Sequence, residues 1–274
     1  MNYPRRFIFR GNASGVSAHI RRPEDRILPV QAASSLPVTG GISESKAGPQ
    51  SLGNYLHFLF AETSAHGDFV DGKAAMAMTR KEIPPDEVPT RTTVTAAVRG
   101  LHVGKRFVAE RAQVGLVSNS PAIGSKQPSI RLEGNAIEGV VVDGHNLKIT
   151  LDEELFSRYD TMEKLQAAQG LAPEQTNMFY SPAGAGRDRL YVSGGMAYAT
   201  IVRSMDWVNG RPEDLEDLGV NAFYLPGFGA VYFGELFISE FSRRLTMIRF
   251  QLGSDAGGDV AVAEGETNGS HWPE

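Results

Sequence analysis

The chain of 274 residues contains no cysteine, and this absence excludes several kinds of chemistry at once. Without thiols there are no disulfides, no thiolate nucleophiles and no zinc sites built on sulfur. A metal ion would have to be bound by histidine and carboxylate groups. No apolar run approaches the roughly 18 residues of a membrane-spanning helix, and the segment Phe7–Phe9 is too short for a signal peptide. We therefore expect a soluble, cytoplasmic protein.

Signature motifs of common enzyme classes are also missing. A nucleophile elbow needs a Gly-x-Ser-x-Gly run between a strand and a helix, and the chain has none. The nearest imitation is Ser193 before Gly194-Gly195, within a predicted strand, where backbone geometry explains the glycines better. There is no Walker loop, and Gly184–Gly186 lacks the third glycine of a dinucleotide site. We predict no cofactor, and the sequence leans against an enzyme.

Charge is moderate but unevenly distributed. The net charge is −5, yet residues 1–50 contain seven basic and three acidic residues, and no basic residue follows Ser254. Opposite charges at the two ends favour contact between the head of one subunit and the tail of another, and the alternative is two solvated ends. The acidic balance and the lack of a recognition module argue against nucleic acid as a partner.

The clearest positive feature is alternation of apolar and polar residues, broken by glycine turns. Residues 231–252 and Thr92–Arg99 show it best, and Asp143-Gly144 is a strong hairpin signal. We predict a mainly β fold, an antiparallel β-sandwich or distorted barrel, in one domain over residues 1–274. The predicted core consists of apolar residues at inward-facing positions of these strands. It comprises Phe58, Phe60, Val94, Val98, Val114, Leu116, Val141, Leu155, Ile201, Phe233, Ile238, Ile248 and Phe250.

Other segments interrupt the strand pattern. An apolar stripe at helical spacing predicts one inserted helix at about 151–169, with Thr150 and Glu153 as its capping box, and proline before acidic residues predicts a short helix near 212–218. Residues 23–53 gather proline and glycine, so we interpret 1–53 as partly an extended arm. The alternative organisation is two β lobes, 1–80 and 90–274, separated by a proline-rich segment.

Two glutamates within apolar strands are candidate ligand-binding residues. Glu110 and Glu235 each have apolar neighbours, and burial would raise the pKa of such a carboxyl group. Strict alternation places Glu235 on the same face as Val231, Phe233 and Phe237. The alternative is an outward-facing or arginine-paired glutamate, for which the available partners are Arg111, Arg244 and Arg249.

Further candidates are aromatic residues and histidines. Tyr180, Tyr198 and Tyr224 would supply polar contacts in an apolar interior pocket, gated by a loop at 183–186. His57, His66 and Asp68 form a candidate metal set, because alternate residues of an extended segment point the same way. The alternative for His57 is a hydrogen-bonded core histidine.

No motif set is specific enough to carry a function over from a known family. The lack of catalytic signatures and the opposed ends favour a non-enzymatic structural or assembly protein. It would form homo-oligomers through its basic N-terminal arm and acidic C-terminal end. The alternative is a β-barrel protein or small enzyme that binds an apolar small molecule in its interior.

Overall fold

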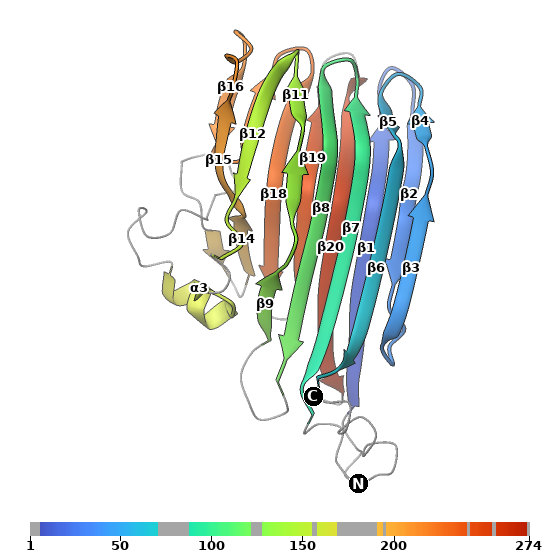
Figure 1. Cartoon of the computed structure of the whole chain (residues 1–274), viewed down its shortest axis with the longest axis vertical. Helices are drawn as coiled ribbons and strands as arrows, with labels where there is room; N and C mark the ends of the chain where they lie inside the picture. The colour runs from blue at the N-terminus through green and yellow to red at the C-terminus, as the bar shows by residue number, and fades with distance from the viewer. Residues whose placement is uncertain are drawn as a thin grey trace.

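The computed structural model describes residues 6–70, 88–121, 128–154, 158–168, 191–193, 196–239, 242–253 and 256–272. Strands dominate this part of the chain and form two antiparallel sheets that face each other (Figure 1). The prediction of a mainly β, antiparallel fold is confirmed. Neither sheet closes on itself, so the form is a sandwich and not a barrel.

The first sheet, sheet A, has nine strands. In spatial order they are β13 (Tyr191–Ser193), β14 (Met196–Thr200), β18 (Gly229–Ser239), β19 (Ser242–Leu252), β20 (Gly258–Trp272), β1 (Arg6–Ile20) and β2 (Arg26–Ser35). Two short strands extend it beside β18, namely β17 (Ala222–Leu225) and β16 (Glu216–Gly219).

The second sheet, sheet B, has eleven strands. The main path is β15 (Val202–Trp207), β12 (His145–Leu151), β11 (Val140–Val142), β8 (Phe107–Ser120), β7 (Thr90–Val103), β5 (Leu56–Phe58) and β4 (Gln50–Leu52). Off this path, β9 (Ser129–Leu132) and β10 (Ala136–Glu138) pair with β8, β6 (Phe60–Phe69) pairs with β7, and β3 (Gly41–Ala47) pairs with β6.

The N-terminal segment belongs to the sandwich. β1 lies between β20 and β2 in sheet A, so the first and last strands are neighbours. Arg21 forms an ion pair with Asp259 at 2.7 Å. The basic head and the acidic tail therefore meet within one chain.

The prediction of a loop or arm at 23–53 is wrong, because this segment contains β2, β3 and β4. Its prolines and glycines occupy positions that strands tolerate. Pro29 lies in β2, an edge strand, where one side of the ladder needs no donor. Pro37 and Gly40 form the turn toward β3, since the Gly40 N–H donates to the Pro37 carbonyl at 3.0 Å. The proposed two-lobe boundary falls between β6 and β7, which are paired in sheet B.

The helical predictions need correction. The helix at 151–169 is only α3 (Met162–Ala168), because β12 continues to Leu151. The Lys164 N–H donates to the Thr161 hydroxyl at 3.3 Å, so Thr161, and not Thr150, is the N-terminal cap. Near 212–218 the Leu215 N–H donates to the Pro212 carbonyl in a turn that leads into β16, and no helix forms.

In each long strand of sheet A, every second side chain points inward, and this alternation shifts by one residue at one position. These positions lie side by side across the sheet and form one row. We call this row the sheet A crease; the paired registers skip it on all five strands, β2, β1, β20, β19 and β18. Its members are Ala32 (φ 54°), Gly15, Ala263 (φ 51°), Met247 and Gly234 (φ 57°). An irregular residue shifts the two-residue alternation by one, so inward positions differ on the two sides of the crease.

Sheet B has a corresponding row, the sheet B crease. It contains Leu59, Gly100, Glu110 and Gly139, and both glycines have a φ of 63°. Inward residues on β7 include Val98 before this row and Leu101 after it, which shows the same change of face. The creases matter for function because they decide which polar side chains point outward.

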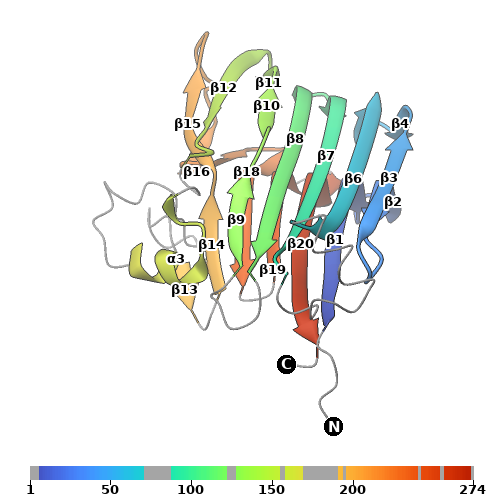
Figure 2. The ribbon, with the colours of Figure 1, turned by 60° about the horizontal axis from the view of Figure 1, so that its bottom comes forward.

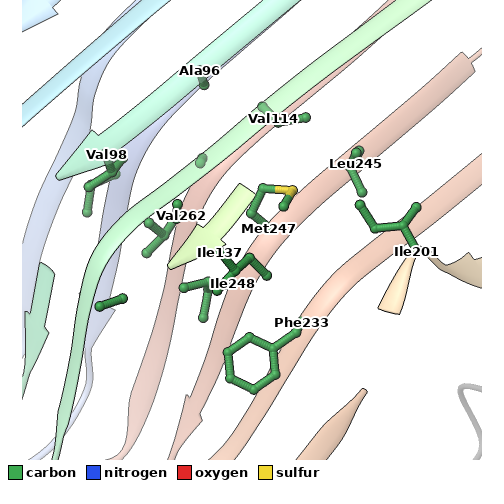
Figure 3. Packing of buried hydrophobic residues seen from close by; sticks show 14 of the residues in the cluster. Ala96, Val98, Val114, Ile137, Ile201, Phe233, Leu245, Met247, Ile248 and Val262 are labelled. Carbon is green, nitrogen blue, oxygen red and sulfur yellow. The ribbon is translucent and has the colours of Figure 1, made fainter. Parts of the chain in front are cut away.

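The core differs on the two sides of the creases. On one side, Phe107 packs against Phe250 with ring centroids 4.8 Å apart and against Phe233 at 6.3 Å. On the other side, glycines take inward positions, and a Cβ atom at Gly265 would lie 3.0 Å from Val94 Cγ2. Figure 3 shows side chains of both sheets meeting in this continuous cluster. Aromatic rings therefore fill the first side, whereas the second combines inward-facing glycines with a separate group of rings in which Phe9 packs against Phe7 and Phe69.

Candidate functional site

Glu235 is paired with an arginine on the outward face of sheet A. Arg249 on β19 donates from Nε and NH2 to the Glu235 carboxylate at 2.6 and 2.8 Å. The Arg249 guanidinium also lies over the Tyr232 ring, 4.0 Å from its centroid. The prediction from strict alternation put Glu235 on the wrong face of the strand. Gly234 lies in the crease and shifts the alternation by one residue, so Glu235 points outward. The arginine-paired alternative is the one that the structure shows, with Arg249 as the partner.

Glu110 is exposed on the outward face of sheet B, within the sheet B crease. Because Glu235 lies on the outward face of the other sheet, the sandwich separates the two carboxylates. They cannot act together across one cleft, as paired acids in hydrolysis must. The other two arginines considered as partners bind elsewhere, since Arg111 pairs with Glu138 at 3.6 Å and Arg244 lies 4.0 Å from Glu264.

The candidate tyrosines in the described residues also lie on outward faces. The Tyr198 ring packs against Phe237, with centroids 4.9 Å apart, and both are half-buried. Tyr224 is half-buried on β17, where Phe223 and Leu225 take the inward positions. Tyr180 and the loop at 183–186 lie outside the described residues. The space between the sheets is occupied by the hydrophobic cluster.

The structure does not bring the candidate metal ligands together. His57 on β5 hydrogen-bonds Ser51 through Nδ1 at 2.8 Å, and its ring lies 5.9 Å from that of His102. His66 and Asp68 are exposed on β6. Against β7, His57 pairs with His102 and His66 with Thr93, positions about 30 Å apart along an extended strand.

The described residues contain neither a metal-binding cluster nor a membrane-spanning helix. No group of three or more histidine, aspartate or glutamate residues there is arranged to hold a metal ion. In that same part of the chain, no helix has both the length and the apolar character needed to cross a membrane.

The outward face of sheet A carries a shallow groove of about 320 Å³. It is lined by Asn12, Ala13, Ser14, Val30, Ala33, Ser34, Ser35, Glu264 and Glu266. Its polar groups bind each other or neighbouring strands. Thr246 donates to Glu264 at 2.8 Å, the Ser242 hydroxyl donates to Glu266, and Ser35 donates to Asn12 at 2.8 Å. These polar groups of the groove are therefore already bonded within sheet A.

The side of the sandwich formed by β2 and β3 consists of edge strands. Figure 2 shows these strands together at one side, with β15 at the other. Among the described strands, β3 pairs only with β6, and β2 only with β1. This side also exposes three aliphatic residues, Ile27, Val30 and Ile42, by 49–67%.

The two edge strands differ in how well they could accept another strand. β2 contains Pro29, which has no N–H, and Ala32 at a positive φ, and its register with β1 is shifted between Val16 and Ala18. Such features blunt an edge against pairing. β3 pairs with β6 in continuous register over seven residues, and residues 42–47 contain neither proline nor a positive φ. β3 is therefore a regular strand at the edge of the described part of sheet B, suited to pairing with a further strand.

Arg243 is a residue that sequence reasoning missed. It lies on β19 with 1% of its surface exposed and donates from NH2 to the Pro128 carbonyl at 3.0 Å. Burial lowers the pKa of its guanidinium to about 10. A signal was available, because Arg243 alternates with Leu245 and Met247, both fully buried. An arginine in this series should have been expected to point inward.

A family model described as a domain of unknown function, DUF8256, matches residues 7–178, which are 172 of the 274 residues. The chain belongs to the DUF8256 family. No curated protein and no solved structure matches the chain. The DUF8256 match includes β1, β2 and the regular edge strand β3, whereas Arg243 and the Glu235–Arg249 pair lie beyond it.

We expect Arg243→Met to raise the free energy of unfolding by about 2 kcal/mol at pH 7, because methionine keeps the length of the side chain without a buried charge. Because this pKa is lowered in the folded state, the unfolded chain binds more protons than the folded chain above pH 10. The cost of burying the cation is thus fully present below pH 10 and declines above it. Urea unfolding at pH 7 and near pH 11 measures both effects.

The matched control for this prediction is Arg244→Met, since the Arg244 side chain is 52% exposed. We expect this control to change stability by less than about 0.5 kcal/mol. Destabilisation of the Arg243 variant at both pH values would contradict the prediction, because contacts of the cation would then outweigh the cost of its burial.

Proposed function

We propose that the protein is a non-enzymatic structural protein that assembles with copies of itself. The observation that carries this proposal is β3, a regular strand of seven residues whose outer edge has no partner strand among the described residues. An edge of this kind adds strands from other chains unless it is covered or blunted. The proposal keeps the cytoplasmic location expected from the sequence.

The contact between subunits differs from the one expected from charge alone. The basic N-terminal segment and the acidic C-terminal segment pair in β1 and β20 of one chain, so they are not free to join two subunits. We therefore assign assembly to the β2–β3 side. Its exposed aliphatic residue on β3, Ile42, would lose contact with water when a second molecule covers this edge.

Sedimentation velocity of the full-length protein over a range of concentrations tests the proposal. We expect an oligomer of defined size whose fraction rises with concentration, and native mass spectrometry should give a multiple of 29.7 kDa without added mass. A monomer at every concentration would contradict the proposal. A monomer that carries an extra small-molecule mass would contradict it in favour of a binding protein.

A further inference from the structure

We infer that two copies of this chain pair antiparallel through β3, with Ser45 of one copy opposite Ser45 of the other. This inference rests on the proposed function and names its partner and its register. Pairing about a two-fold axis at β3 would extend sheet B from one molecule into the next. The same surface then serves both copies, and the assembly closes as a dimer.

The faces of the β3 side chains restrict the register. In the ladder with β6, Ser45 lies opposite Thr63, which is buried, and Glu44 lies opposite Ser64 on the outward face. Ser43, Ser45 and Ala47 thus face inward, and Ile42, Glu44 and Lys46 face outward. Residues opposite each other in an antiparallel pair share one face of the sheet. If both copies keep their cores on the same side, only registers centred on a residue satisfy this condition.

Charge selects among these registers. A register centred on Glu44 places two glutamates opposite each other, and one centred on Lys46 does the same with two lysines. A register centred on Ser43 places Lys46 opposite Gly40 and makes no charge pair. Only the register centred on Ser45 places Glu44 of each copy opposite Lys46 of the other. Opposite charges in such positions stabilise a strand pair, and like charges destabilise it.

The surroundings of β3 are compatible with this pairing. Lys46 lies 3.9 Å from Glu62 of its own chain, but the two side chains are 68% and 38% exposed, so this contact is weak and leaves the ammonium group accessible. Behind β3, the Ser35 N–H of β2 donates to the Ser43 hydroxyl at 3.3 Å, which ties the two edge strands together. Because β2 is blunted by Pro29, the pairing is confined to sheet B.

The test compares single and double charge reversals by sedimentation velocity. Glu44→Lys and Lys46→Glu each turn two attractive pairs into two repulsive ones, so we expect each to raise the dimer dissociation constant about tenfold or more. The double variant Glu44→Lys/Lys46→Glu restores both pairs and should return the constant to within about threefold of the original. Lys105→Glu is the control for Lys46→Glu, since it makes the same change of net charge at an exposed lysine outside β3. Thermal unfolding of each variant verifies the fold.

The outcomes separate this inference from the proposed function. An oligomer that none of these substitutions affects would overturn the β3 pairing and leave self-assembly standing. Weakening by both single variants without recovery in the double variant would overturn the register centred on Ser45. A monomeric original protein would overturn both the inference and the proposed function.

Discussion

Replacing Gly15 by valine is expected to lower the free energy of unfolding by about 3 kcal/mol or more, or to prevent folding. Gly15 lies in the sheet A crease and is buried. A Cβ atom there would lie 2.7 Å from the Gln31 carbonyl oxygen and 2.8 Å from the Ala61 Cβ. The first contact is with backbone on the neighbouring strand and the second with the facing sheet, so neither can move aside easily.

Gly48→Val is the matched control for this experiment. A Cβ atom at Gly48 would have nothing within 4 Å, and its φ is not in the left-handed region. We expect this control to change stability by less than about 1 kcal/mol in urea unfolding followed by circular dichroism. Similar stability of the two valine variants would show that the sheets have room to separate at Gly15, which contradicts the close packing described above.

A second large effect is expected at Gly115 on β8. A Cβ atom there would lie within 2 Å of the Glu133 carbonyl oxygen. At this point the Asn135 side chain takes the place of a strand: its Oδ1 accepts from the Gly115 N–H at 2.9 Å, and its Nδ2 donates to the Gly115 carbonyl at 3.1 Å. Glu153 in turn accepts from the Asn135 N–H at 2.6 Å. Even a methyl group would displace this connection.

We therefore expect Gly115→Ala to lower the free energy of unfolding by about 3 kcal/mol, because it combines a steric clash with the loss of two part-buried hydrogen bonds. Gly253→Ala is the control, since its Cβ would have only an ordinary 3.6 Å contact with the Gly229 Cα. Chemical denaturation compares the two variants. Equal stability would contradict the assigned role of Asn135 as a substitute for strand pairing.

The alternating pattern predicted the fold class and most of the core correctly. Val94, Val98, Phe233 and Phe250 are fully buried as expected. The errors are local, since Phe60 and Val141 are only half-buried. Leu155 lies outside the described residues, so its burial stays a prediction. Alternation works for these strands because one face of each sheet packs against the other sheet, whatever the exact strand order is.

The creases explain why faces were harder to predict than strands. Strict alternation along β18 placed Phe233 and Glu235 on one face, but Phe233 points inward and Glu235 outward, because Gly234 shifts the pattern. A glycine inside a strand is a recognised sign of a bulge. Ala32 and Ala263 have the same backbone conformation and give no such sign. Their positions in the crease depend on how neighbouring strands align, and this alignment cannot be predicted from the sequence.

Segment 23–53 shows a second reason why the sequence predicted the structure only in part. Proline and glycine usually indicate loops, yet they are also tolerated in edge strands, and the edge position of β2 depends on the whole sheet order. The partner of Glu235 could not be predicted either, because three arginines were available and only the folded structure shows that Arg249 on β19 binds it. Candidate residues could thus be named from the sequence, while their neighbours depended on strand pairing.

Hydrogen–deuterium exchange of the backbone amides in residues 41–47, measured at low and high protein concentration, tests the central claim most directly. Pairing through β3 would place the free amides of this edge in hydrogen bonds, so their exchange should slow as concentration rises. Exchange in β15, at the other side of the sandwich, should not change. If oligomers form while exchange in residues 41–47 stays the same, β3 is not the surface through which this protein assembles.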